Sequence, residues 1–181
     1  MSTTLDNVFM QLCKDYPEMH LEQDATGEII MMAPAGAGTG GRNSKLVCQL
    51  ENWVTASGLG KSFESSAGFT LPNGARRAPD AAWVRMERWN TLTVAEQEGF
   101  APLCPDFVVE LRSPSDRLPR LRAKMREYIA QGARLGWLID PRRRVVEIYR
   151  PGRLVETLKD PGTVSGEGVL PGFVLDLRDI L

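Results

Sequence analysis

Residues 105–116 read PDFVVELRSPSD, and the segment Phe107–Leu111 (FVVEL) decides the fold. A nearly unbroken apolar run of this length predicts a buried central strand. Glu110 is the one residue that interrupts the run. Burying an ionised carboxylate without a partner is expensive, so Glu110 must be paired, protonated or bound to a cation.

Strand alternation separates the polar and apolar residues of this stretch, because successive side chains point to opposite faces of a sheet. One face carries Asp106, Glu110 and Arg112, and the other carries Phe107, Val109 and Leu111. A purely structural interpretation pairs Glu110 with Arg112 or with a base on a neighbouring helix.

A second acid, Asp80, lies among small and apolar residues in the stretch 77–84 (RAPDAAWV). As a strand-edge residue it could bond local backbone amides. Together with Glu110, on a consecutive core strand, it could instead chelate Mg²⁺. This ion prefers hard oxygen ligands and keeps several waters, one of which can become a nucleophile.

The remaining pattern predicts an α/β (α+β) fold with a mixed central sheet flanked by helices. One helix is expected from Arg42 onward, with Asn43 extending its apolar stripe, and another over 118–129, with Lys124 at the edge of the buried stripe. Strands are predicted over 62–71, 78–84, 107–111 and 135–139, with additional hairpins over 19–33 and beyond residue 140. The core order is helix, three strands, helix, strand, in one domain spanning residues 1–181.

An insertion between the core strands carries the capping-box pattern Thr93-x-x-Glu96, which predicts a short surface helix. Trp89, in the same insertion, is the tryptophan that we expect to be exposed. The other three tryptophans lie on predicted core elements and are interpreted as packing residues.

Composition excludes several classes of site. No apolar run approaches the roughly 18 residues of a membrane span, and the first residues lack a signal core, so we expect a cytoplasmic protein. The three cysteines form no C-x-x-C pair, which gives no indication of a disulfide framework or a cysteine zinc site. The single histidine argues against His-rich zinc sites. Any catalysis is therefore expected from carboxylates and lysine.

The net charge of −1 hides a strong separation of charge. Residues 112–153 contain twelve bases and four acids, a net charge of +8, whereas the remainder carries −9. Arginines of this segment, among them Arg117, Arg120 and Arg122, could follow a phosphate backbone. A solvated helix face with a basic turn explains the pattern equally well.

The glycine-rich segment 36–41 matches G-x-G-x-x-G and raises the alternative of a dinucleotide-binding domain. Against that alternative, Pro34 intervenes, the expected acid near the end of the next strand is replaced by Leu-Pro-Asn at 71–73, and no second βαβ unit follows. We interpret the glycines as a flexible loop beside the site.

Pro79-Asp80 followed by Glu110-Leu111-Arg112, on the element order above, resembles the PD-(D/E)XK nuclease core. The segments RAPDAAWV, CPDFVVELRSPSDRL, KMREYIAQGARLGWLIDP and VVEIYRPG are similar to the large bacterial Uma-type family of restriction endonucleases. The resemblance runs from Glu22 to the LPGFVLDL tail. It implies a restriction-endonuclease-like αβββαβ core.

The resemblance also implies site residues. Asp80, Glu110 and the backbone carbonyl of Leu111 would hold the metal, Mg²⁺ with Mn²⁺ as a second option, while Glu22 and Asn43 match polar positions that could border the site. Arg112 replaces the motif's lysine, and its guanidinium cannot act as a base, although it could neutralise phosphate. Lys124 is the natural substitute, with a pKa that we expect to be depressed near such a site.

The mechanism implied is attack of water on a DNA phosphodiester, with Mg²⁺ stabilising the developing charge and Lys124 orienting or deprotonating the water. Structural salt bridges of Asp80 and Glu110 are the bland alternative. A non-catalytic protein that keeps the fold and binds DNA or another protein is the second. A homodimer is a possible assembly, because a symmetric pair can cut both strands.

Overall fold

The computed structural model describes residues 2–181, and within them the chain forms five helices. Their bounds are α1 (Ser2–Asp15), α2 (Ala37–Ser57), α3 (Met86–Trp89), α4 (Val94–Glu98) and α5 (Leu118–Ala130). The capping box at Thr93 and Glu96 begins α4 as predicted. No helix in the described part of the chain is long and apolar enough to cross a membrane.

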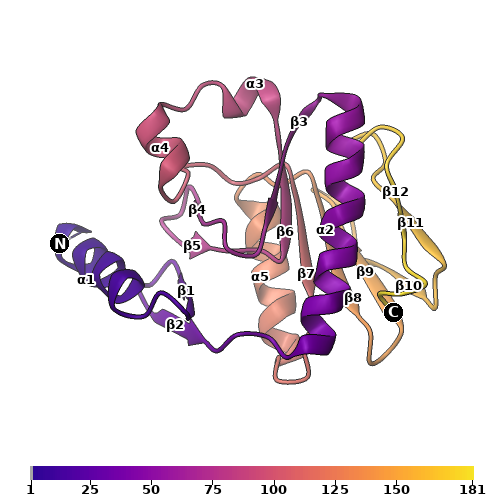
Figure 1. The fold of residues 1–181 in the computed structure, drawn as a ribbon, viewed down its shortest axis with the longest axis horizontal. Helices are drawn as coiled ribbons and strands as arrows, with labels where there is room; N and C mark the ends of the chain where they lie inside the picture. The colour runs from indigo at the N-terminus through magenta and orange to yellow at the C-terminus, as the bar shows by residue number, and fades with distance from the viewer. Residues whose placement is uncertain (1) are drawn as a thin grey trace.

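The central sheet has six strands in the order β10-β9-β8-β7-β6-β3 (Figure 1). Strands β3, β6 and β7 form an antiparallel meander, β8 lies parallel to β7, and β9 and β10 continue antiparallel. Parallel neighbours need a crossover connection, which α5 supplies between β7 and β8. The bounds are β3 (Gly60–Glu64), β6 (Ala81–Arg85), β7 (Phe107–Leu111), β8 (Leu135–Asp140), β9 (Val145–Tyr149) and β10 (Glu156–Lys159). The predicted mixed α/β fold and its core order are confirmed.

Two smaller sheets accompany the central one. The four-stranded sheet has the order β2-β1-β5-β4, with β1 (His20–Gln23), β2 (Ile29–Met32), β4 (Phe69–Thr70) and β5 (Arg76–Arg77), and the two-stranded sheet contains β11 (Thr163–Ser165) and β12 (Val174–Asp176). The prediction of one strand over 62–71 was wrong. The chain turns after β3, where the amide of Ala67 donates to the carbonyl of Glu64, and β4 joins the other sheet.

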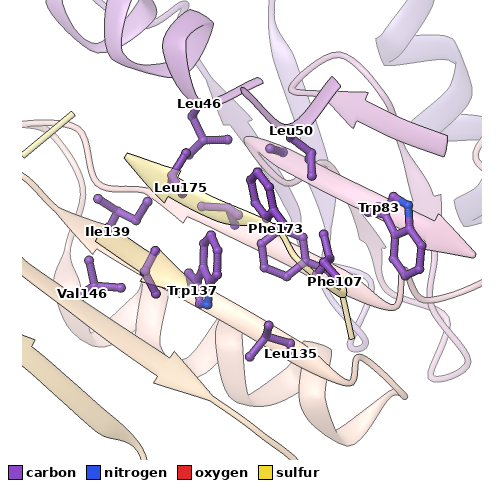
Figure 2. Close-up of a cluster of buried hydrophobic side chains, with 14 of the residues drawn as sticks. Leu46, Leu50, Trp83, Phe107, Leu135, Trp137, Ile139, Val146, Phe173 and Leu175 are labelled. Carbon is purple, nitrogen blue, oxygen red and sulfur yellow. The ribbon is translucent and has the colours of Figure 1, made fainter. Parts of the chain in front are cut away.

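Helices cover both faces of the central sheet, α2 in front and α5 behind in Figure 1. Under α2, an apolar cluster joins Leu46 and Leu50 to Phe107 and Trp137 of the sheet and to Phe173 of the C-terminal segment (Figure 2). This cluster contains all three apolar residues predicted for one face of β7. Glu110 therefore faces the opposite side, toward α5.

Two expectations are corrected, one about the exposure of Trp89 and one about the conformation of the glycine-rich segment. Trp89 is 6% exposed and packs against Phe63, because the insertion folds back over the end of β3. The glycines at 38, 40 and 41 lie in the first turns of α2 and do not form a flexible loop. Their weak helix propensity is outweighed by the buried apolar face of the helix. Because α2 follows β2 of an antiparallel sheet, the structure agrees with the rejection of the dinucleotide-binding alternative.

Candidate metal centre

The two predicted metal ligands lie side by side, Glu110 in β7 and Asp80 immediately before the neighbouring strand β6. Strands β6 and β7 pair antiparallel with Ala81 opposite Val109, so the same register, continued by one residue, places Asp80 opposite Glu110. Residues directly opposite each other in a sheet have side chains within contact range. A hydrogen bond of 2.6 Å from the Leu111 amide to Oδ2 of Asp80 fixes the first carboxylate beside the second.

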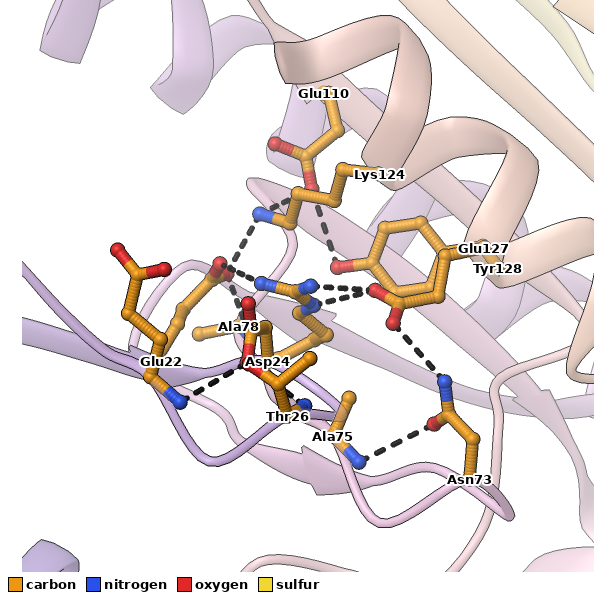
Figure 3. A network of polar contacts seen from close by, with 12 residues as sticks. Glu22, Asp24, Thr26, Asn73, Ala75, Ala78, Glu110, Lys124, Glu127 and Tyr128 are labelled. Atoms are coloured by element: carbon orange, nitrogen blue, oxygen red, sulfur yellow. Dashed lines mark hydrogen bonds and ion pairs between the residues drawn. The ribbon is translucent and has the colours of Figure 1, made fainter.

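Lys124 reaches this pair from α5 (Figure 3). Its Nζ lies 2.7 Å from Oε1 of Glu110 and 2.6 Å from Oε1 of Glu22, and only 11% of its side chain is exposed. Tyr128, one helical turn further, donates from its hydroxyl to the same Glu110 oxygen at 3.2 Å. The structure thus brings together Lys124, Glu110 and Glu22, three residues selected from the sequence.

Glu22 is itself held by groups that sequence reasoning missed. Its second oxygen bonds to the guanidinium of Arg77 at 3.1 Å, and its first also accepts the amide of Ala78 at 3.0 Å. The Arg77 guanidinium also forms an ion pair with Glu127 on α5, with Nη2 2.6 Å from Oε2. No local spacing in the sequence links Glu22 to Arg77, because the two residues are 55 positions apart.

Formal charges do not balance in this group, which we call the site cluster: Glu22, Arg77, Asp80, Glu110, Lys124 and Glu127. Burial raises the pKa of Asp80 to about 6, against the hydrogen bond from Leu111. Burial, helped by the charges of Asp80 and Glu22, raises the pKa of Glu110 to about 8, although Lys124 opposes the shift. The cluster therefore has more acids than its two bases can neutralise, which favours the protonated forms of Asp80 and Glu110 while no cation is bound.

The pKa of Lys124 moves opposite to our expectation. Burial alone would lower the pKa, but the charges of Glu110 and Glu22 outweigh it and raise the pKa above the usual lysine value. The pKa of Glu22 is lowered, because Lys124 and Arg77 together outweigh the effect of its burial. The expectation of a depressed lysine pKa considered desolvation and missed the second carboxylate.

Asn43 and Arg112 lie near the centre in different roles. The Asn43 amide nitrogen donates to the backbone carbonyl of Asp80 at 3.2 Å, and its buried Oδ1 has no hydrogen-bond partner among the described residues. Arg112 turns away to Asp140, with Nη1 2.8 Å from Oδ2. Its charge is therefore engaged with β8, although it stands two residues after Glu110.

The donor set fits a divalent cation of the Mg²⁺ type. Two carboxylates with raised pKa values gain most from a nearby cation, and the unpartnered Oδ1 of Asn43 could accept a hydrogen bond from a water of its hydration shell. Within residues 2–181 no group of three His, Cys, Asp or Glu side chains is arranged to hold an ion. A cation that keeps several waters needs no such group.

The arginines predicted to contact phosphate divide between two sides of α5. Arg117 and Arg120 are exposed, and helical spacing places them on the same stripe as Lys124. Arg122 lies on another side of the helix, where its guanidinium holds both oxygens of Glu147 on β9. Tyr149 donates to the same carboxylate at 2.8 Å. We call Arg122, Glu147 and Tyr149 the Glu147 cluster.

The family model for Uma2, described as "Putative restriction endonuclease", matches residues 7–178. The chain belongs to this family. The Uma2 assignment agrees with the resemblance carried by Asp80, Glu110 and the segments around them.

A solved structure with low sequence identity supports the fold. The crystal structure of a protein from Anabaena variabilis, titled as "a putative nuclease belonging to DUF820", aligns with a TM-score of 0.74 and 22% sequence identity over 88% of each chain. A comparison with curated proteins gives no match. The family description indicates a nuclease, and the neighbour, at 22% identity, supports the fold alone.

Proposed function

We propose that this Uma2 member is a metal-dependent DNA endonuclease whose Mg²⁺ or Mn²⁺ is held by Asp80, Glu110 and the backbone carbonyl of Leu111. The observation that carries the proposal is the juxtaposition of half-buried Asp80, immediately before β6, with buried Glu110 on β7, two carboxyl groups whose charged forms the protein compensates only in part. When bound, the metal would stabilise charge on the phosphate and make a water more acidic.

Lys124 is the residue that we assign to the reacting water or phosphate. An ammonium group has three N–H donors, and the contacts with Glu22 and Glu110 use two of them. The third can orient a water or a phosphate oxygen. Arg112 is not needed for this role, because its guanidinium is committed to Asp140.

The DNA backbone would approach along α5. The exposed guanidinium groups of Arg117 and Arg120 continue the Lys124 stripe toward the start of the helix, which suits a phosphate track leading to the centre. Arg122 contributes less in this proposal, since Glu147 already neutralises it. Two copies would be needed to cut both strands at once, which makes a homodimer the expected active assembly.

Plasmid cleavage tests the proposal. Supercoiled plasmid is incubated with Mg²⁺, Mn²⁺ or EDTA and with the wild type, Asp80→Asn, Glu110→Gln or Lys124→Gln. Arg126→Gln, which removes an exposed base from the same helix as Lys124, serves as a matched control. We expect metal-dependent nicking by the wild type and the control, and none by the other three variants. Metal binding without cleavage would point to a specific substrate, and neither activity would favour the non-catalytic DNA- or protein-binding alternative.

A further inference from the structure

One contact of the candidate metal centre works against metal binding. The Lys124 ammonium, 2.7 Å from Glu110, already occupies a carboxylate that the proposed function assigns to a divalent cation. The ammonium and the cation carry charge of the same sign and would lie within a few ångströms of each other in a largely buried site. Such repulsion is strong where water cannot screen it.

Glu22 offers the ammonium a second position. It binds the same nitrogen at 2.6 Å, as closely as Glu110 does. Arg77 and the Ala78 amide fix this carboxylate on the side of the cluster formed by β1 and β5. Glu127 holds Arg77 in turn, and Asn73 donates a hydrogen bond to Glu127. Figure 3 shows the Lys124 ammonium between the two acids, Glu22 on one side and Glu110, which also accepts the Tyr128 hydroxyl, on the other.

We propose that Lys124 competes with the divalent cation for Glu110, and that Glu22 is a positioning residue which holds the ammonium off the metal ligand. The inference rests on the metal site of the proposed function. It gives a second use to a carboxylate that otherwise only borders the site. Glu22 acts on the metal through Lys124 and does not coordinate it.

Opposite changes in metal affinity follow from this arrangement. Lys124→Gln removes the competing charge, so Mn²⁺ should bind about tenfold more tightly even though cleavage is lost. Glu22→Gln leaves the ammonium on Glu110 alone, so Mn²⁺ should bind about tenfold more weakly, the usual size of an effect from a residue behind a ligand. The double variant should bind like Lys124→Gln, because Glu22 has no competitor left to hold.

Mn²⁺ binding to chelator-stripped protein, measured by calorimetry without nucleic acid, tests the proposal. Lys124→Arg keeps the charge and serves as the matched control, with an affinity close to that of the wild type. Circular dichroism and thermal unfolding identify any variant that does not fold. Should Glu22→Gln fail that check, Glu22→Asp, which keeps the charge but shortens the reach, should give an intermediate loss of affinity.

The outcomes separate this inference from the proposed function. Equal or weaker Mn²⁺ binding by Lys124→Gln, with the wild type still binding, would overturn the competition alone. A further loss of affinity when Glu22→Gln is added to Lys124→Gln would make Glu22 a ligand and overturn its positioning role. Absence of Mn²⁺ binding by every variant would overturn both the competition and the metal centre.

Discussion

Two buried glutamates of the central sheet have the same surroundings in kind and opposite electrostatic states. Leu138 pairs with Glu110 on one side and with Glu147 on the other, so the two acids lie in one row across β7, β8 and β9. Both face α5 and are about equally buried, each at 4% exposure. Each carboxylate accepts a hydrogen bond from a tyrosine hydroxyl, of Tyr128 on α5 for Glu110 and of Tyr149 on β9 for Glu147. Each also pairs with a basic side chain of α5.

The difference lies in how the charge is balanced. Burial raises the pKa of Glu147, but the paired guanidinium of Arg122 and the Tyr149 hydroxyl outweigh it and lower the pKa below its usual value. Glu110 shares one lysine with Glu22, and its pKa rises to about 8. The bidentate pair of Arg122 and Glu147 is complete by itself and serves a structural role. The Lys124 ammonium is shared between Glu110 and Glu22, so a cation could still stabilise the ionised form of Glu110.

The largest expected effect is on catalysis at Glu110. Glu110→Gln should lower metal-dependent plasmid cleavage by about 10³-fold, because it removes charge that stabilises the reaction through the metal. The same change replaces a buried carboxyl group whose charged form the cluster disfavours with a neutral amide, so the free energy of unfolding in EDTA should stay level or rise. Cleavage assays and urea titrations measure the two quantities. A loss of stability in Glu110→Gln would show that Glu110, like Glu147, stabilises the fold, and would contradict the distinction drawn between the two acids.

The matched substitution Glu147→Gln should do the reverse. It strips Arg122 of its carboxylate and should reduce the free energy of unfolding by about 2 kcal/mol, less than for a fully buried pair because the side chain of Arg122 is 36% exposed. Plasmid cleavage by the folded variant should remain within about threefold of wild type. Loss of cleavage at full stability would assign Glu147 to the site and contradict our division of the row.

Sequence patterns predicted this row in part. The apolar run and its alternation gave β7 and the face of Glu110, and helical spacing gave α5 with Lys124 toward the sheet, because both are local properties. The contact of Glu22 with Arg77 joins residues 55 positions apart, and the pairing of Arg122 with Glu147 joins residues 25 apart. No local period encodes such contacts. The direction of the Lys124 pKa shift, and the separation of Arg122 from the exposed Arg117 and Arg120, could therefore be seen only in the folded structure.

The free energy of unfolding should depend on pH in opposite ways for the site cluster and the Glu147 cluster. In EDTA, Asp80 and Glu110 bind more protons in the folded than in the unfolded state between about pH 4 and 8, so the free energy of unfolding contributed by the site cluster falls as pH rises. Glu147 contributes stability above its unfolded pKa, near 4.3, and loses it as pH falls through the lowered folded value.

Urea unfolding at several pH values measures these slopes. Asp80→Asn and Glu110→Gln should flatten the decline above pH 5, each by on the order of 1 kcal/mol per pH unit at most, and Mg²⁺ should flatten it in the wild type. Glu147→Gln should leave that decline in place and reduce the loss of stability below pH 4. A decline unaffected by either site variant would show that other groups produce it.

The smallest effects should come from the two tyrosine hydroxyls, compared as Tyr149→Phe and Tyr128→Phe. The Tyr149 hydroxyl donates to a carboxylate that stays ionised, at 2.8 Å, so its loss should cost about 1 to 2 kcal/mol of unfolding free energy. The Tyr128 bond is longer, 3.2 Å, and Glu110 keeps its ammonium partner, so the cost should be below about 1 kcal/mol. Denaturant titrations of both variants at pH 7 measure the costs. A larger loss for Tyr128→Phe would mean that the Tyr128 hydroxyl, rather than Lys124, is the main partner stabilising Glu110 in the metal-free protein.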